Sequence, residues 1–210
     1  MQRLLLSLAS LLLIAGLHAQ APFCPGETFE GMAPISMNSC DLVEYQGDLY
    51  GISAWPGPPN STLTKYDIAT GVSTVISIPP FPLGETSLTE HNGKLYIFGG
   101  WTGTSPSNQA HTYDIASNSW QNLPNMPVNM TQTSAVTLGN SIYITGGTLG
   151  VTVQHFLRFD VATNSYTTLT PPSNFTNSKL LVRGGQVLCL GGHRYGSGGF
   201  ETSALFNVYD

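Results

Sequence analysis

Charged residues are scarce in this chain. Asp, Glu, Lys and Arg make up 9% of its 210 residues, against about 25% in an average globular domain. The protein surface must therefore be covered by Ser, Thr, Asn, Gly and Pro. The charge that is present is mildly acidic, with seven basic and twelve acidic residues. This balance argues against nucleic acids and anionic membrane surfaces as partners.

Long apolar runs are missing after residue 17. Residues 4–17 are apolar, follow Arg3 and precede small residues at Ala19 and Ala21. This pattern is typical of a secretory signal peptide, and we expect residues 1–21 to be removed. No later stretch has the roughly 18 apolar residues that a membrane-spanning helix needs. The sequence therefore predicts an exported protein, which is extracellular, periplasmic or at the cell surface, without a membrane span.

Motifs for metal binding and catalysis are also missing. The five histidines are scattered, and no His-x-His, His-Glu-x-x-His, Cys-x-x-Cys or Gly-x-Ser-x-Gly spacing occurs. We therefore expect no metal, no cofactor and no catalytic residue. Of the three cysteines, Cys24 and Cys40 are expected to form a disulfide in an oxidising compartment, with Cys189 as a buried thiol. The alternative is that all three are unpaired.

The chain is rich in internal repetition, with a period of about 46 residues. Glycine pairs recur at intervals of 47 and 45 residues, as Gly99-Gly100, Gly146-Gly147 and Gly191-Gly192. An aromatic-Asp step recurs beside them, as Tyr66-Asp67, Tyr113-Asp114, Phe159-Asp160 and Tyr209-Asp210. Periods of this length are the sequence signature of solenoids and propellers.

Each repeat reads as four short strands, named a to d here in chain order. In the second repeat we expect them at about 85–92, 94–100, 109–115 and 119–125. Strand b is apolar at four consecutive positions, 95–98, so both of its faces must be buried. The Asp-x-Ala-Thr/Ser-Gly/Asn segment predicts a tight turn between c and d, in which the carboxylate bonds the backbone two residues on. Trp120 and Tyr166 then begin strand d as large apolar anchors between sheets.

A glycine pair after four apolar residues, followed by a spaced aromatic pair such as Tyr113 and Trp120, resembles the kelch repeat. The resemblance covers about residues 24–210 and is best in the second and third repeats. It implies an all-β fold: a β-propeller of four-stranded antiparallel blades over residues 22–210, with repeats at about 39–82, 83–129, 130–172 and 173–210. It also implies structural roles for the three glycine pairs and for Tyr113, Trp120, Phe159 and Tyr166. The first repeat departs from the pattern, with Ser53-Ala54 in place of the glycine pair and Ser73 where Trp120 stands.

The fourth repeat ends at Asp210, before any strand d. Near the N-terminus, residues 28–34 resemble residues 119–125. We therefore expect a strand at 27–33 to complete the last blade, as in propellers similar to this one, and a Cys24–Cys40 bridge to tie that strand to the next blade. About four blades result, fewer than the six or seven common in kelch propellers. We lean to a closed ring of four, and the alternative is a piece of a larger ring.

Kelch propellers commonly bind ligands on the face formed by their b–c and d–a loops. Mapped onto this chain, the b–c loops are about 54–60, 101–108, 148–154 and 193–203. Trp55 and Trp101 hold the same place in successive repeats. The candidate ligand-binding residues on this face are Trp55, Trp101, His193, Arg194, Tyr195, Phe81, Met130 and Phe175. The alternative is that the aromatic residues cap their own blades.

We therefore expect a secreted, non-catalytic kelch propeller that binds a protein or carbohydrate partner through this face. One alternative is a fragment of a galactose-oxidase-like or other propeller enzyme, although no set of copper ligands can be matched to this sequence. A second alternative is a truncated kelch protein without independent function.

Overall fold

The computed structural model describes residues 41–54, 61–81, 84–148, 151–171, 177–196, 199–202 and 206–209. The chain divides into two compact units, Met1–Pro34 and Ile35–Asp210, and every described residue belongs to the second. The expected signal peptide, the expected strand at 27–33 and the Cys24–Cys40 pair therefore lie outside the described residues. Within the described part, no helix is long and apolar enough to cross a membrane.

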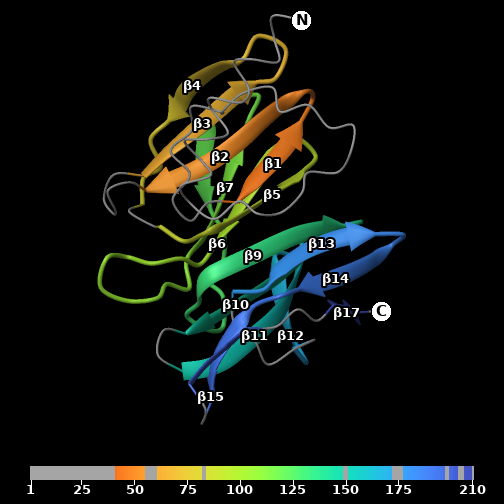
Figure 1. Ribbon diagram of the computed structural model, residues 1–210. Coiled ribbons are helices and arrows are strands. Elements are labelled where there is room, and N and C mark those ends of the chain that lie inside the picture. Colours follow the sequence, from red (N-terminus) through yellow and green to blue (C-terminus); the bar gives the residue numbers. More distant parts are fainter. Residues whose placement is uncertain are drawn as a thin grey trace, which may run out of the picture. The chain divides into compact units, whose positions relative to one another are not determined.

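The described part is all-β, and its four main sheets are the blades of a β-propeller (Figure 1). The first three sheets have four antiparallel strands each, joined in chain order. They are β1 (Leu42–Tyr45), β2 (Asp48–Ala54), β3 (Ser61–Asp67) and β4 (Val72–Ser77); β5 (Ser87–His91), β6 (Lys94–Phe98), β7 (Ala110–Asp114) and β8 (Ser119–Asn122); β9 (Thr131–Leu138), β10 (Ser141–Thr148), β11 (Val151–Asp160) and β12 (Ser165–Leu169). The all-β propeller predicted from the repeat is confirmed.

The fourth sheet has three strands among the described residues. They are β13 (Lys179–Arg183), β14 (Gln186–Leu190) and β17 (Phe206–Tyr209), in that order. Between β14 and β17 the chain forms a separate hairpin of β15 (His193–Gly196) and β16 (Gly199–Thr202). The strands thus follow the expected order a, b and c, and completion of this sheet by residues 27–33 stays a prediction.

Strand b of the second sheet is buried on both faces, as its apolar run requires. Leu95 and Ile97 pack into an apolar cluster shared with the first sheet. Tyr96 and Phe98 point the other way, into a cluster shared with the third sheet. Full burial of such a side chain contributes about 2 kcal/mol, so each sheet is held by its neighbours.

The turn between strands c and d is a single helical turn closed by its aspartate. In the first sheet, the Gly71 amide donates to the Asp67 carbonyl oxygen over 2.8 Å, and the Thr70 amide donates to the Asp67 carboxylate over 2.9 Å. Asp114 and Asp160 bind the amides of Ser117 and Thr163 in the same way. The carboxylate therefore bonds the amide of the third residue on, and also that of the second residue on as expected, because the chain coils as at a helix N-terminus. These amide bonds lower the pKa of all three carboxyls.

Large aromatic residues at the start of strand d link successive sheets. The Trp120 indole donates to Ser77 Oγ of the first sheet over 2.8 Å. The Tyr166 hydroxyl donates to the Pro124 carbonyl oxygen, next to the second sheet, over 2.9 Å. Ser77 and Pro124 hold equivalent places in their repeats, 47 residues apart. Each aromatic residue therefore lies between its own sheet and the preceding one.

The glycine pair after strand b lies against the start of the neighbouring sheet. The Gly100 amide donates to the Met130 carbonyl oxygen over 2.8 Å. A Cβ atom added at Gly99 would lie 2.8 Å from that oxygen and 3.0 Å from Thr133 Cγ2, and one at Gly100 would overlap the Gly84 carbonyl oxygen. These contacts leave no room for a side chain, which explains why glycine recurs here.

Gly99→Ala tests this close approach, with Gly139→Ala as its matched control. Both glycines are left-handed, at φ +63° and +60°, but a Cβ at Gly139 would meet nothing within 4 Å. The left-handed backbone alone should cost Gly139→Ala about 1 kcal/mol of unfolding free energy. Gly99→Ala adds the overlap and should cost about 3 kcal/mol or more. Urea unfolding measures both, and equal losses would show that the contact with Met130 is unimportant.

Candidate binding face

The b–c loop of the second sheet is held on both sides by d–a loops. The Trp101 amide donates to the Gly84 carbonyl oxygen over 2.6 Å, and the Gly84 amide returns a bond to the Trp101 carbonyl oxygen over 2.9 Å. On the other side, the Met130 amide donates to the Ser107 carbonyl oxygen over 2.9 Å. Both ends of this loop are thereby fixed to the chain that leads into strands β5 and β9.

The tip of the same loop is ordered by Thr102. Its amide donates to the Ser105 carbonyl oxygen over 3.0 Å, and its hydroxyl oxygen accepts the Ser105 amide over 3.1 Å. Gly103, Thr104 and Ser105 are exposed, and Trp101 is half-buried. The loop therefore presents small polar groups and part of an indole ring on a fixed backbone.

Phe81 and Met130, which sequence analysis placed on the binding face, lie in the interior. Phe81 is 5% exposed and stacks on the His111 ring with 3.7 Å between ring centroids. Met130 is fully buried in the cluster between the second and third sheets. Neither side chain offers a surface to a ligand in this structure, because each fills the space between two sheets.

The other predicted face residues are placed only in part. Trp55 and Phe175 lie outside the described residues. Arg194 and Tyr195 belong to β15, and His193 at its start is half-buried. The sequence predicts a b–c loop at 193–203, whereas the backbone forms the β15–β16 hairpin, with His193 opposite Thr202. Of the six candidates in the described part, Trp101 thus lies in an ordered surface loop, whereas Phe81 and Met130 are buried.

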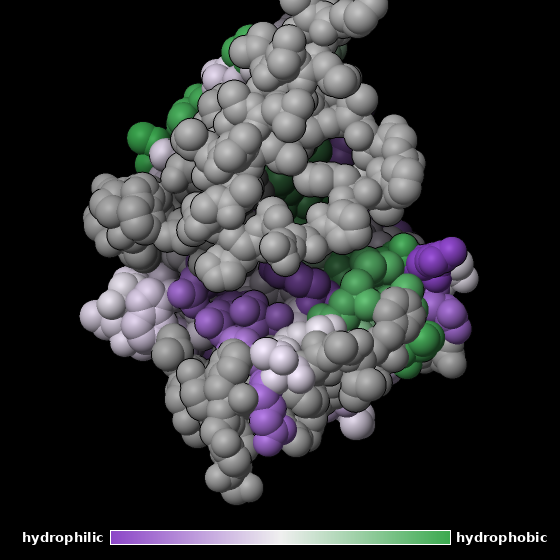
Figure 2. Space-filling model, viewed as in Figure 1, coloured by the Kyte–Doolittle hydropathy of each residue, from purple (hydrophilic) through white to green (hydrophobic). Residues whose placement is uncertain are grey.

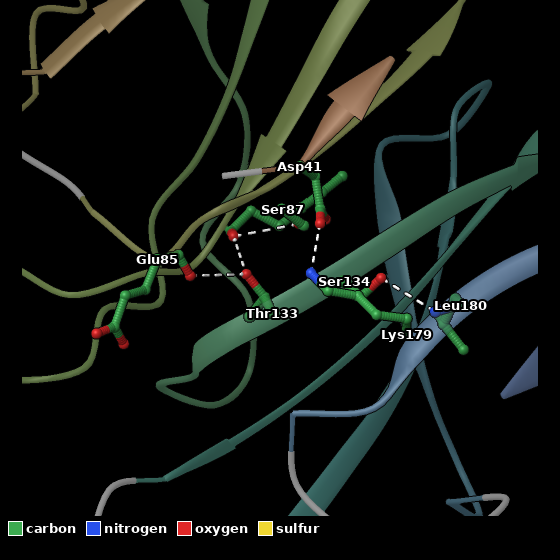
Figure 3. Close-up of polar contacts among 8 residues, drawn as sticks. Asp41, Glu85, Ser87, Thr133, Ser134, Lys179 and Leu180 are labelled. Atoms are coloured by element: carbon green, nitrogen blue, oxygen red, sulfur yellow. Dashed lines mark hydrogen bonds and ion pairs between the residues drawn. The ribbon is translucent and has the colours of Figure 1, made fainter. Parts of the chain in front are cut away.

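A polar network that sequence analysis missed joins the beginnings of the inner strands (Figure 3). The Thr133 hydroxyl donates to the Phe98 carbonyl oxygen over 2.9 Å, and the Thr131 hydroxyl donates to the Glu85 carboxylate over 2.6 Å. The Leu180 amide donates to Ser134 Oγ over 3.1 Å. These bonds connect the second, third and fourth sheets directly beneath the loops of the candidate face.

A left-handed backbone conformation also recurs with the repeat, near the starts of the inner strands that this network joins. Glu85, Gln132 and Asn177 all adopt left-handed conformations, at φ 53°, 52° and 56°. They are spaced by 47 and 45 residues, the intervals of the glycine pairs. A polar residue near the start of strand a was therefore detectable as part of the repeat, although its side chain differs in each copy.

An ion pair links the inner strands of the first and fourth sheets (Figure 3). Lys179 Nζ lies 2.5 Å from Asp41 Oδ1, and these residues hold equivalent places in the first and fourth repeats. Burial raises the pKa of the Asp41 carboxyl, although Lys179 and the Leu88 amide lower it. Asp41 Oδ2 is buried without a hydrogen-bond partner. The ion pair therefore only partly compensates for the desolvation of this carboxylate.

The histidines provide little chemistry in the described part. Burial lowers the pKa of the His111 and His155 rings. His111 Nδ1 lies 3.0 Å from Asn122 Oδ1, beneath the ring of Phe81. Among the described residues, no group of three His, Cys, Asp or Glu side chains could hold a metal ion. Cys189 is a buried free thiol.

Lys179→Met tests whether the ion pair supports the first and fourth sheets. It leaves Asp41 buried without its cation, so we expect a loss of about 1–2 kcal/mol of unfolding free energy at pH 7, less than for a fully buried pair because Lys179 is half exposed. Because the pKa of Asp41 is raised, its contribution to stability is fully present below its unfolded pKa of about 3.8 and falls as pH rises. The loss should therefore shrink on acidification.

Lys94→Met is the control, because Lys94 pairs with the Asp114 carboxylate at 3.7 Å on the surface, where solvent screens the attraction and little stability should be lost. Urea unfolding between pH 7 and pH 4 measures both variants. A loss in Lys179→Met that is independent of pH would assign the effect to the lysine methylenes rather than to the charge.

Comparisons with known proteins agree with this architecture. The family model described as the KLHDC2/KLHL20/DRC7 Kelch-repeats domain matches residues 60–199, more than half of the chain. Kelch-like protein terF of Aspergillus terreus is 29% identical over 171 residues, which cover 71% of this chain and 37% of that protein. Kelch-like protein 40 of Xenopus laevis is 34% identical over 59 residues, which cover 28% of this chain and 10% of that protein.

The chain thus spans well under half the length of either relative. The family match extends over parts of all four sheets, and it includes the glycine pairs and the aromatic residues that join the sheets. The protein belongs to the kelch-repeat family.

Proposed function

We propose that this chain is an exported, non-catalytic module that binds a protein through the face bearing the b–c loop of Trp101. The observation that carries this proposal is the fixation of that loop by Gly84 on one side and Met130 on the other. A loop that is ordered before binding loses little conformational entropy when a partner docks, which increases affinity.

The composition of the loop favours a protein partner. Tryptophan is enriched among the residues that dominate protein interfaces, and Trp101 is half-buried at the base of the exposed tip. The tip itself carries Thr102, Thr104 and Ser105, which are small and can adapt their hydrogen bonds. Many binding loops combine an aromatic ring that anchors the partner with hydroxyl groups that adapt their hydrogen bonds.

The scarcity of charge predicts how the partner is recognised. Residues 86–110, which include this loop, carry charges only at Glu90 and Lys94 among Asp, Glu, Lys and Arg. Binding should therefore depend on shape and hydrogen bonds and respond weakly to salt, since salt screens only charged groups. Export is part of the proposal and is supported by the basic, apolar and small-residue pattern of residues 1–21.

Trp101→Ala should abolish partner binding and leave the melting temperature nearly unchanged, because the loop is held by backbone bonds that alanine retains. The immobilised full chain is incubated with extracellular proteins of the producing organism, and captured proteins are quantified by mass spectrometry in low and high salt. Thr168→Asn, on the outer strand β12, is the control. Capture of the same proteins by wild type and Trp101→Ala would contradict the proposal.

A glycan array run with the same three proteins tests the carbohydrate alternative. Binding of a glycan by the wild type and the control but not by Trp101→Ala would assign the face to a carbohydrate. A strong fall in melting temperature for Trp101→Ala would show instead that the indole caps its own sheet.

A further inference from the structure

Glu85 carries a carboxylate that the fold holds in place but does not neutralise. Its Oε2 atom accepts the Thr131 hydroxyl over 2.6 Å, and the residue is half-buried. Figure 3 shows its carbonyl oxygen turned toward Thr133, whereas its carboxylate points away from the Asp41–Lys179 pair. Among the described residues, no lysine or arginine forms an ion pair with it. An ordered anionic group is therefore left without a cation.

The other carboxylates of the first three sheets all stabilise the fold. They pair with lysines, close the turns between strands c and d, or accept backbone amides in the turns after strand a. The pairs involve Asp41, Asp48 and Asp114, the first kind of turn Asp67, Asp114 and Asp160, and the second kind Glu44 and Glu90. In the described part, the charge of Glu85 has no such role.

The equivalent residues show that the fold needs no charge at this place. Gln132 and Asn177 follow Glu85 in the next two repeats and share its left-handed backbone, with φ of 52° and 56° against 53°. Both side chains are neutral amides, whose oxygen can accept a hydrogen bond as a carboxylate does. The negative charge is therefore peculiar to Glu85, and the packing of the sheets does not explain it.

Glu85 lies where the loop of Trp101 is attached. Gly84, directly before it, exchanges two backbone bonds with Trp101, and Met130, directly before Thr131, donates to Ser107 at the other end of the loop. The bond between Thr131 and Glu85 thus joins the two segments that hold the loop. Figure 2 shows hydrophilic surface where Figure 1 draws the start of β9, the strand that Thr131 begins.

We propose that Glu85 binds a lysine or arginine side chain of the protein that docks on the loop of Trp101. The inference rests on the proposed function, because it names what the same face selects in its partner. A carboxylate accepts hydrogen bonds but cannot donate them, so a cationic donor suits it best. Residues 101–108 and 123–131 carry no charge, so Glu85 provides the charge complementarity of these segments.

The single carboxylate contributes specificity more than affinity. A partner with a basic residue at this place is attracted, and one with an acidic residue is repelled. One ion pair at a half-buried site adds little binding energy, so the response of binding to salt stays weak. Shape and hydrogen bonds then hold the partner, and Glu85 decides which partners fit.

Selection of random peptides displayed on phage, with the full chain as immobilised bait, tests the inference. The wild type should enrich peptides that contain Lys or Arg, and Glu85→Gln should lose this preference. Glutamine can still accept the Thr131 hydroxyl and is the residue of the next repeat, so the melting temperature should not change. Glu90→Gln removes the same charge near the other end of β5, keeps an acceptor for the Gly93 amide, and should behave as the wild type.

Trp101→Ala separates this inference from the proposed function. Equal enrichment of the same peptides by the wild type and Trp101→Ala, or no enrichment by the wild type, would overturn both. Enrichment that requires Trp101 but shows no preference for basic residues would overturn the role of Glu85 alone. A basic preference that Glu85→Gln retains would do the same.

A double-mutant cycle on one selected peptide then measures the pair by calorimetry. Replacing the basic residue of the peptide by glutamine should weaken binding to the wild type about three- to fivefold. The same replacement should not weaken binding to Glu85→Gln. Equal losses on both proteins would assign the basic residue to another contact. On the glycan array, a neutral glycan that binds the wild type but not Glu85→Gln would show that the carboxylate accepts sugar hydroxyls instead.

Discussion

A sheet that is apolar on both faces cannot be stable alone, and this constraint underlies the whole structure. In the second sheet, Leu95 and Ile97 need cover on one face, and Tyr96 and Phe98 need it on the other. The first and third sheets supply that cover. Stability is thus a property of neighbouring pairs, as in other repeat architectures, and the chain gains it by repeating one unit rather than by building one central core.

Packing sheets face to face then fixes where their loops can go. The second sheet approaches the third so closely at Gly99 that the Met130 carbonyl oxygen takes the place of a side chain. The amide of the same Met130 donates to the carbonyl oxygen of Ser107, at the end of the b–c loop. The residues that allow close packing and the residues that hold the candidate loop are therefore adjacent in space and in sequence. Rigidity of the loop is a consequence of how the sheets pack, and this links the fold to the proposed function.

The repeat was sufficient to predict the strands, because Leu95 to Phe98 and their copies alternate with turns at a fixed interval. It could not show that Phe81 and Met130 face inward, because an apolar residue in a loop segment reads equally well as a surface anchor or as a plug between sheets. The network of Glu85, Thr131 and Thr133 was missed since its bonds join residues about one repeat apart. Short-range spacing carries no information about such contacts, and the side chain at the place of Glu85 differs in every copy.

Departures from the repeat are as informative as the repeat itself. Trp120 and Tyr166 each bond to a residue at or just past the end of the outer strand of the preceding sheet. Ser73 holds the place of Trp120 in the first repeat. Its hydroxyl is buried without a hydrogen-bond partner. For the first sheet the preceding one is the fourth, whose described residues include no outer strand that could supply the acceptor. Among the described residues, the ion pair of Asp41 and Lys179 joins the same two sheets by a charge contact, whereas each other pair of neighbouring sheets shares an apolar cluster.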